Sequence, residues 1–199
     1  MIADERFYPK EFNLNFDSYV RHYERYFECL KLSEQIGIDQ VWLDCACGSG
    51  YGTNFLSNFV KKIYGYDISK EAIEYAIKNY KNDKTDFFNN LDAIENNSID
   101  LVLSVETIEH MPQNETNIFF TKLKKTLKKD GKLIITTPIV EKTNTNPKNK
   151  FHFIEYSDID FVELLKINNF MVEKNKFILT KFTDGEEKYQ GYYKCRKIN

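Results

Sequence analysis

The chain has 199 residues, of which 42% are hydrophobic and 15% aromatic. This is enough apolar material to bury a core, and it excludes a disordered or fibrous protein. The formal net charge of −2 lacks the basic excess typical of proteins that grip a nucleic-acid backbone. The apolar runs are too short to span a bilayer, so we expect no membrane span. The segment MIADERFYPK lacks the apolar stretch that a signal peptide has, so we expect a cytoplasmic protein.

Four cysteines are too few for a disulfide scaffold, and we expect them to pack as small buried hydrophobes. Cys45 and Cys47 lie in an apolar stretch, and the sequence has no second Cys/His pair at zinc spacing, so we predict no metal site. The lysine-rich segment 122–129 places Leu123 and Leu127 four residues apart. This spacing is typical of an amphipathic helix whose lysines face water.

Strands and helices alternate along the chain. Apolar runs bounded by turn residues predict strands at 41–45, 62–67, 85–89, 99–105, 132–137, 170–180 and 189–194. Helical periodicity and capping residues predict helices at 16–36, 70–80, 114–128 and 157–168, with a short one near Thr53. The last two strands have no helix between them, and Asp184-Gly185 is the expected turn.

This order predicts an α/β fold with a Rossmann-like, doubly wound, mostly parallel seven-stranded sheet and a C-terminal antiparallel hairpin. We expect a single domain over 1–199, with an N-terminal helical cap at 1–37 and the Rossmann-like core at 38–199. Sites in such sheets lie beyond the carboxyl ends of the strands. The residues that follow each strand are therefore the candidates for function. The oligomeric state is left open.

A glycine-rich turn, DCACGSGYG, follows the first predicted strand at residues 44–52. Gly48 and Gly50 let the backbone approach a ligand closely and adopt conformations that other residues avoid. A dinucleotide-binding turn has the pattern G-x-G-x-x-G/A, and here Thr53 holds the last position. The acid Asp44 suits a ligand with an ammonium and a sulfonium group better than a pyrophosphate. A dehydrogenase is therefore the weaker interpretation.

Two more acids follow predicted strands. Asp67 can accept hydrogen bonds from both hydroxyls of a ribose, as the acid of dinucleotide sites does. The alternative role, capping the next helix, suits Ser69 better. Asp92 follows the third strand, where it can accept from an adenine amino group or be a plain turn acid.

With these features the chain resembles the class I S-adenosylmethionine (SAM)-dependent methyltransferases, from about Tyr19 to the last strand. The segments that carry the resemblance are VWLDCACGSGYG, IYGYDIS, IDLVLSVETIEH and GKLIITTP. The stretches HYERY (22–26) and NKFHFIE (149–155) are similar to a narrower bacterial group often found among surface-polysaccharide enzymes. Cys47 departs from the usual form of the family's turn, and Ile139 stands where the narrower group usually has Asn, which bears on the acceptor pocket.

The resemblance implies that SAM is the cofactor, that Asp44, Gly48 and Gly50 meet its methionine part, and that Asp67 meets the ribose. Arg25, one helical turn after His22, either closes over the cofactor carboxylate or is an exposed helix charge. The full set of predicted cofactor-binding residues is Asp44, Ala46, Gly48, Gly50, Tyr51, Asp67, Ile68, Leu91, Asp92, Glu106 and Arg25.

Methyl transfer from a sulfonium needs an aligned acceptor and, for a hydroxyl, a base within reach of its proton. His110, just past the fourth strand, is the first candidate base because an unperturbed imidazole has a pKa of ~6.5. His152, with Glu155 as an orienting partner, is the second. Each histidine has the alternative of a structural role, bonding a loop backbone.

The segment after the fourth strand reads ETIEH and lacks the Asn/Asp-Pro-Pro-aromatic motif of nucleic-acid amino-methyltransferases. We therefore expect a small or medium acceptor and no nucleic-acid partner, with O-methylation of a sugar or nucleotide-linked precursor of a surface glycan by analogy to the subgroup. Two alternatives stay open. One is an N- or S-methyltransferase acting on a metabolite or a protein side chain, and the other is a non-catalytic SAM-binding module.

Overall fold

The computed structural model describes residues 7–9, 16–34, 38–181 and 187–198. The strands are β1 (Val41–Cys45), β2 (Lys62–Tyr66), β3 (Thr85–Phe88), β4 (Ile99–Val105), β5 (Leu127–Ile139), β6 (Phe170–Lys181) and β7 (Glu187–Lys197). The α-helices are α1 (Phe16–Ser33), α2 (Tyr51–Leu56), α3 (Lys70–Tyr80), α4 (Gln113–Thr126) and α5 (Asp158–Ile167). Two short 3-10 helices, η1 (Leu91–Ala93) and η2 (Ile108–His110), lie after β3 and β4.

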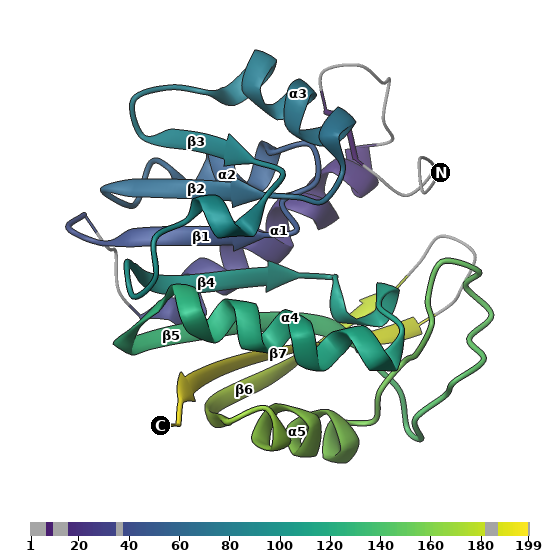
Figure 1. The fold of residues 1–199 in the computed structure, drawn as a ribbon. Helices are drawn as coiled ribbons and strands as arrows, with labels where there is room; N and C mark the ends of the chain where they lie inside the picture. Colours follow the sequence, from purple (N-terminus) through teal and green to yellow (C-terminus); the bar gives the residue numbers. More distant parts are fainter. Residues whose placement is uncertain (1–6, 10–15, 35–37, 182–186, 199) are drawn as a thin grey trace.

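The strands form one sheet in the order β3-β2-β1-β4-β5-β7-β6 (Figure 1). The pairs from β3 to β5 are parallel, and β7 runs antiparallel to both β5 and β6. The predicted doubly wound, mostly parallel sheet with an antiparallel C-terminal hairpin is therefore confirmed. The expected turn at 184–185 lies outside the described residues. Among those described, no helix combines the length and apolar character that crossing a membrane requires.

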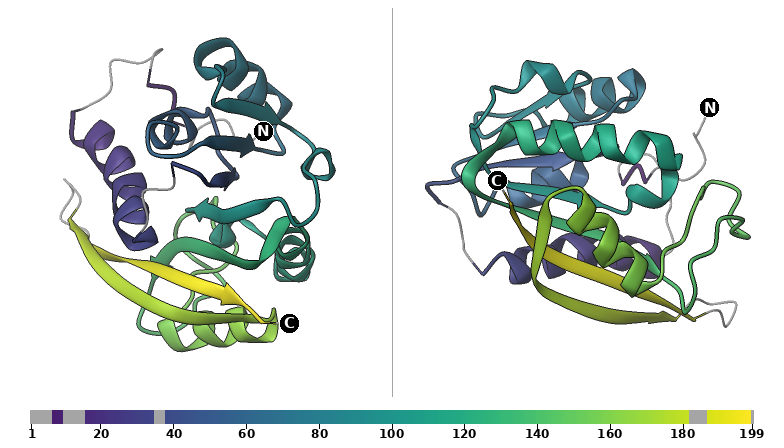
Figure 2. Two further views of the ribbon diagram at one scale, coloured as in Figure 1. Left: turned by 90° about the vertical axis from the view of Figure 1, so that its left-hand side faces the viewer. Right: turned by 60° about the horizontal axis from the view of Figure 1, so that its bottom comes forward.

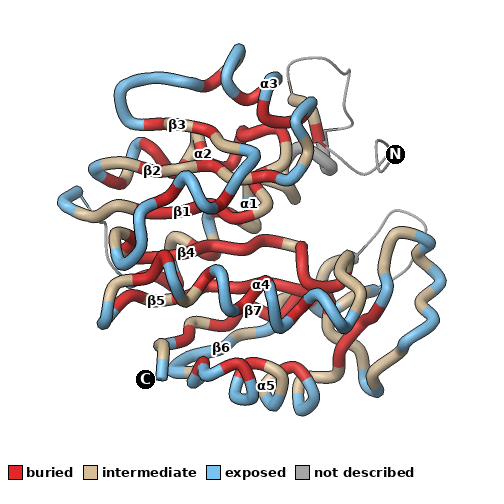
Figure 3. The backbone as a smooth tube through the Cα atoms, in the orientation of Figure 1, coloured by how far each residue is buried: buried red, intermediate tan, exposed pale blue. Residues whose placement is uncertain are grey.

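Side chains that alternate along the central strands enter two separate cores. Trp42 and Leu103 pack on the face covered by α1, α2 and α3, whereas Leu43 and Val102 pack on the face covered by α4 and α5. Because both faces are covered, the central strands are almost wholly buried (Figure 3), as expected for a parallel sheet. Successive side chains enter opposite cores, and both cores are apolar. The central strands therefore read as continuous apolar runs in the sequence.

The helix predicted to reach residue 128 ends at Thr126, and β5 begins at once with Leu127. The backbone N–H groups of Asn97 and Ser98 donate to the carbonyls of Lys125 and Thr126, at 2.9 and 3.0 Å. These bonds satisfy carbonyls that end the helix. Leu127 is fully buried and pairs with Ile99. The tertiary contacts thus override the local helical pattern.

The C-terminal hairpin lies against α1 and also forms one edge of the sheet (Figure 2). Lys176 on β6 forms an ion pair with Glu28, and Lys194 on β7 bonds the carbonyl of Ser33 and the carboxylate of Glu34 at 3.1 and 2.8 Å. The hairpin therefore connects the N-terminal helix to the far edge of the sheet.

Gly52 provides a test of how closely α1 packs on α2. A Cβ at this position would overlap the ring of Tyr26, which is 3% exposed and has no room to move. We expect Gly52→Ala to lower the free energy of unfolding by about 1–3 kcal/mol, the usual cost of overpacking, in urea denaturation. On a Tyr26→Ala background the same substitution should cost much less. An equal cost on both backgrounds would show that the two residues do not meet.

Candidate functional site

The predicted site residues gather at the carboxyl ends of the parallel strands. Cys45 on β1 lies beside Tyr66 on β2, and Tyr66 lies beside Phe88 on β3. On the other side, Val105 at the end of β4 lies beside Thr136 on β5. The loops that follow these strands therefore share one edge of the sheet, as parallel topology requires. A hollow of about 390 Å³ lies at the opposite edge of the sheet, near Gln40, Asp100 and Gly131.

The turn after β1 has a backbone that few residues other than glycine adopt. Ala46, Gly48 and Gly50 have φ angles of 67°, 54° and 84°, in the left-handed region. A Cβ on Gly50 would lie 2.7 Å from the Cβ of Ala76 on α3, so the turn packs tightly there. A Cβ on Gly48 would meet no atom within 4 Å. The turn is therefore packed on one side and open at Gly48.

Asp67 joins this turn to the start of α3. One carboxylate oxygen accepts the backbone N–H of Gly48, and the other accepts that of Ser69, both at 2.9 Å. Ser69 in turn caps α3 by accepting from Ala72 N–H at 3.2 Å, which confirms the helix cap predicted from sequence. The two roles weighed for Asp67 are thus both compatible with its position, because it is 94% buried yet lies directly under the open turn.

Asp44 is fully buried beneath the turn. Thr53 donates to one of its oxygens at 2.7 Å, and the hydroxyl of Tyr26 lies 3.5 Å from the other. Burial raises the pKa of this carboxyl to about 7, and the nearby charge of Asp67 adds to the rise. Direct contact of Asp44 with a cofactor remains a prediction. In the structure its bonds attach α1 and α2 to the end of β1.

Residues of α1 reach the same edge. His22 Nδ1 and the hydroxyl of Tyr51 are hydrogen-bonded at 3.0 Å, and the ring of Phe7 stacks on His22 with centroids 4.1 Å apart. Burial, followed by the charge of Arg25, lowers the pKa of His22 to about 3, so this imidazole is neutral. Arg25 lies 3.6 Å from Glu106 and is paired with it.

Glu106 and the adenine-side candidates are placed at this edge as well. Glu106 has a φ of 51° and accepts from Thr136 at 2.8 Å and from Gln190. Leu91 is buried, whereas Ile68 is 82% exposed and Asp92 is exposed. The structure thus brings the predicted cofactor-binding residues to one edge, and their contacts with a ligand remain predictions.

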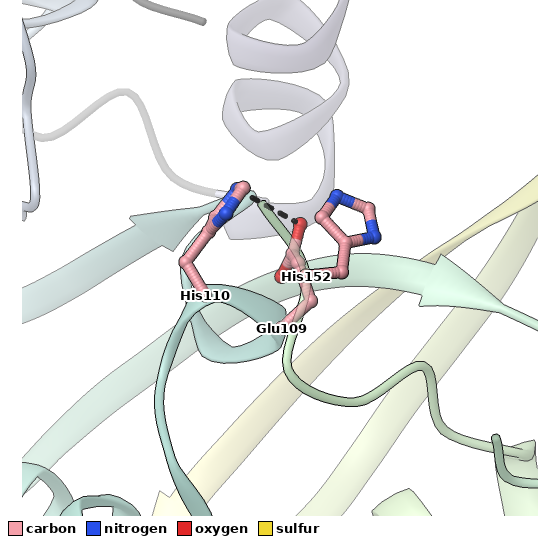
Figure 4. A group of neighbouring side chains, drawn as sticks. All are labelled: Glu109, His110 and His152. Atoms are coloured by element: carbon pink, nitrogen blue, oxygen red, sulfur yellow. Dashed lines mark ion pairs between the residues drawn. The ribbon is translucent and has the colours of Figure 1, made fainter. Parts of the chain in front are cut away.

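The two candidate bases meet beyond β4 and β5. The rings of His110 and His152 are perpendicular, with centroids 4.9 Å apart, and the carboxylate of Glu109 lies next to them (Figure 4). Glu155 contacts His152 Nδ1 at 2.8 Å, so the predicted orienting contact is present. His110 Nδ1 lies 3.0 Å from the carbonyl of Phe151. Each Nδ1 faces an oxygen that only accepts, so in the neutral form of either imidazole the proton lies on Nδ1 and the lone pair on Nε2.

The segment that carries His152 is held in place by its backbone. The N–H groups of Phe153 and Ile154 donate to the carbonyl of Glu109 at 2.7 and 3.4 Å. Asn144 and Glu155 exchange two backbone bonds of 2.8 and 2.9 Å, which close the base of the loop after β5. A hollow of about 390 Å³ lies beside this loop, with Glu155, Lys148 and Lys188 in its lining.

Several residues of the site escaped the sequence analysis. Glu109 is 1% exposed and accepts from Thr137 at 3.0 Å. Burial, followed by the charge of Glu106, raises its pKa well above the usual value. Glu109 stood in the ETIEH motif without a predicted role, and its position directly before His110, a candidate base, was the available signal. Thr137 and Gln190 lie within strands, where nothing in the sequence distinguishes them from other residues.

Residues 43–135 match a family model described as a methyltransferase domain. A probable SAM-dependent methyltransferase of Mycolicibacterium smegmatis is 24% identical over 135 residues, which cover 66% of this chain and 52% of the relative. Phosphoethanolamine N-methyltransferase 2 of Caenorhabditis elegans is 31% identical over 121 residues, which cover 56% of this chain. The matched regions span about half of the first relative and 27% of the second.

Solved structures share the fold. The crystal structure of Burkholderia thailandensis 1,6-didemethyltoxoflavin-N1-methyltransferase, with its substrate and S-adenosylhomocysteine bound, superposes with a TM-score of 0.72. The likeness covers 92% of this chain and 87% of that one, at 12% identity. The sheet order and the C-terminal hairpin are therefore those of a methyltransferase fold.

The buried carboxyl of Asp44 predicts a pH-dependent stability. Its pKa is about 7 in the folded chain, against a usual value of 3.8, so the folded state keeps a proton that the unfolded chain releases. Its contribution is present below pH ~4 and is lost as the pH rises through about 7. Relative to Asp44→Asn, the wild type should lose on the order of 4 kcal/mol over this range, at ~1.4 kcal/mol per pKa unit. Denaturation curves at pH 4, 5.5 and 7 measure this, and a pH-independent difference would contradict it.

Proposed function

We propose, from the premise that residues 43–135 form a methyltransferase domain, that this chain is a SAM-dependent methyltransferase acting on a hydroxyl of a small acceptor. One observation carries the proposal. The glycine turn with Asp67 and the pair of histidines after β4 and β5 lie at the same edge of the sheet. The first provides a place for a cofactor, and the second provides groups that can take a proton.

The residues of the turn fit a nucleoside cofactor. Gly48 opens the backbone on one side, since no atom lies within 4 Å of the place where a Cβ would stand. Asp67 beneath it is a carboxylate of the type that accepts ribose hydroxyls. The exposed side chain of Ile68 follows directly, where an apolar surface suits the face of a purine. When bound, SAM supplies an electrophilic methyl group on a sulfonium.

The residues on the acceptor side suit a hydroxyl. His110 Nε2 is the lone-pair nitrogen, and its ring is positioned by the Phe151 carbonyl. It can take the hydroxyl proton while the acceptor oxygen forms its bond to the methyl carbon and the C–S electron pair remains on sulfur. The ring of His152, whose centroid lies 4.9 Å from that of His110, is the second candidate base and is positioned by Glu155.

A sugar or a nucleotide-linked sugar is the acceptor class that we propose. The resemblance to surface-polysaccharide enzymes supports it, and so does the hollow beside the loop after β5, where Lys148 and Lys188 can meet a phosphate. A second candidate reaction is N-methylation of a phosphorylated amine. The similarity to phosphoethanolamine N-methyltransferase 2 of Caenorhabditis elegans favours it. Acceptor screens should therefore include both classes.

We expect the chain to bind SAM and not NAD. Calorimetric titration with SAM should give micromolar affinity, and titration with NAD should show no binding. Asp67→Ala should abolish SAM binding because it removes the carboxylate under the turn, whereas Asp86→Ala, at a partly buried acid on the neighbouring strand β3, should leave it unchanged. Preference for NAD, or SAM binding that survives in Asp67→Ala, would contradict the cofactor site.

We expect the chain to catalyse methyl transfer. With labelled SAM and a panel of sugars, sugar nucleotides and phosphoethanolamine, the labelled methyl group should pass to a hydroxyl. His110→Gln should lower kcat by about 10²–10⁴, the usual contribution of a general base, with little change in the affinity for SAM. Full turnover in both His110→Gln and His152→Gln would exclude the histidines as bases. Transfer to the amine alone would replace the hydroxyl acceptor with a nitrogen.

A further inference from the structure

We propose that Glu109, His110 and His152 bind a divalent transition-metal ion, and that this ion holds the acceptor oxygen. One ligand atom from each of these residues lies within 4.8 Å of the others. This departs from the expectation of a metal-free protein, which rested on the absence of zinc-like cysteine and histidine spacing. The ion's role in catalysis rests on the proposed function, whereas its binding does not.

The three side chains converge from two elements. Glu109 and His110 are neighbours in η2, and His152 comes from the segment after β5. Figure 4 shows the carboxylate of Glu109 between the two imidazole rings. His110 Nε2 lies 3.9 Å from Glu109 Oε1. Ligands of one metal ion are about 3 Å apart, since each bond is ~2.0–2.2 Å long. Because the ligand atoms lie within 4.8 Å of one another, closure by about 1–2 Å completes the site.

Both histidines have the second partner that metal-bound histidines need. Nδ1 of His152 is held by the carboxylate of Glu155, and Nδ1 of His110 by the carbonyl of Phe151. Such contacts fix the ring orientation and place the lone pair on Nε2, the usual ligand atom. Two histidines and one carboxylate on one side of an ion leave other positions open for substrate oxygens.

The surroundings of Glu109 also indicate a cationic occupant. Its side chain is 1% exposed, and one oxygen accepts from Thr137. Among the described residues, no lysine or arginine lies within ion-pair distance of it. A buried carboxylate without a cation is costly. The hydroxyl of Tyr156 is buried and has no hydrogen-bond partner in the described part of the chain, which is a feature of sites that take a polar occupant. Burial, followed by the charge of Glu109, raises the pKa of this hydroxyl.

A bound ion changes the chemistry of the acceptor side. It polarises a coordinated hydroxyl and lowers its pKa. The proton then passes to water, the oxygen bonds the methyl carbon, and the C–S electron pair remains on sulfur. His110 is then a ligand and not the base. Imidazole nitrogens and a carboxylate suit Zn²⁺, Co²⁺ or Mn²⁺, and a larger share of oxygen ligands would be needed for Mg²⁺ or Ca²⁺.

Titration of the chelator-treated full chain with Co²⁺ and with Zn²⁺ tests this inference. We expect one equivalent to bind with a Kd in the micromolar range or below, with visible Co²⁺ bands. Glu155→Gln should weaken binding roughly 10- to 100-fold, because Glu155 orients the ring of His152. Glu109→Gln and His152→Ala should weaken it further. Glu115→Gln, at an exposed acid on α4, should leave binding unchanged. All four cysteines are buried, so their thiols should not compete.

A second measurement needs no variant and so is insensitive to misfolding. In the spectrum of the wild type with ¹⁵N-labelled histidine, Co²⁺ should shift or broaden the signals of two of the three histidines, His110 and His152, and leave that of His22. No binding below millimolar concentrations, or binding unaffected by all three site variants, would overturn the ion site. An ion site without any methyl transfer would contradict the proposed function alone. Methyl transfer without ion binding would contradict the ion site alone.

Discussion

The carboxylate of Asp67 connects the turn after β1 to the helix after β2, and the proposed cofactor half of the site depends on it. Its two oxygens accept the backbone N–H groups of Gly48 and Ser69. These bonds keep the turn in its left-handed conformation, with Gly48 facing open space. A carboxylate that already holds the turn in place needs little rearrangement to meet a ligand, and preorganisation of this kind lowers the cost of binding. The parallel sheet contributes by ending β1 and β2 side by side.

Acids buried at this edge show how the fold combines stability with chemistry. Asp44 and Glu109 both have raised pKa values because burial penalises their charged forms. Asp44 offsets part of that penalty through Thr53, whereas Glu109 has Thr137 and two neighbouring histidines. Titratable groups in such settings are concentrated at functional sites. The cluster after β4 therefore differs from an ordinary core, and we propose that it faces the acceptor.

The sheet, its order and the antiparallel hairpin could be predicted because apolar period, turn residues and helix caps all agreed. Ser69 capped α3 as its spacing predicted, but α4 ended before the lysine-rich pattern did, since Asn97 and Ser98 bond its last carbonyls from a distant loop. The glycine turn and Asp67 were visible because strand ends are functional positions in such sheets. Thr137 and Tyr156 were not, because their importance comes only from the three-dimensional proximity of Glu109.

We propose that one edge of the sheet carries both halves of the site. Hydrogen–deuterium exchange with and without S-adenosylhomocysteine tests it most directly. We expect slower amide exchange at residues 46–52 and 67–69, the turn after β1 and the segment that leads into α3, with a smaller effect at 106–110. Protection confined to residues 128–132 and 40, at the opposite edge of the sheet where the other hollow lies, would contradict it.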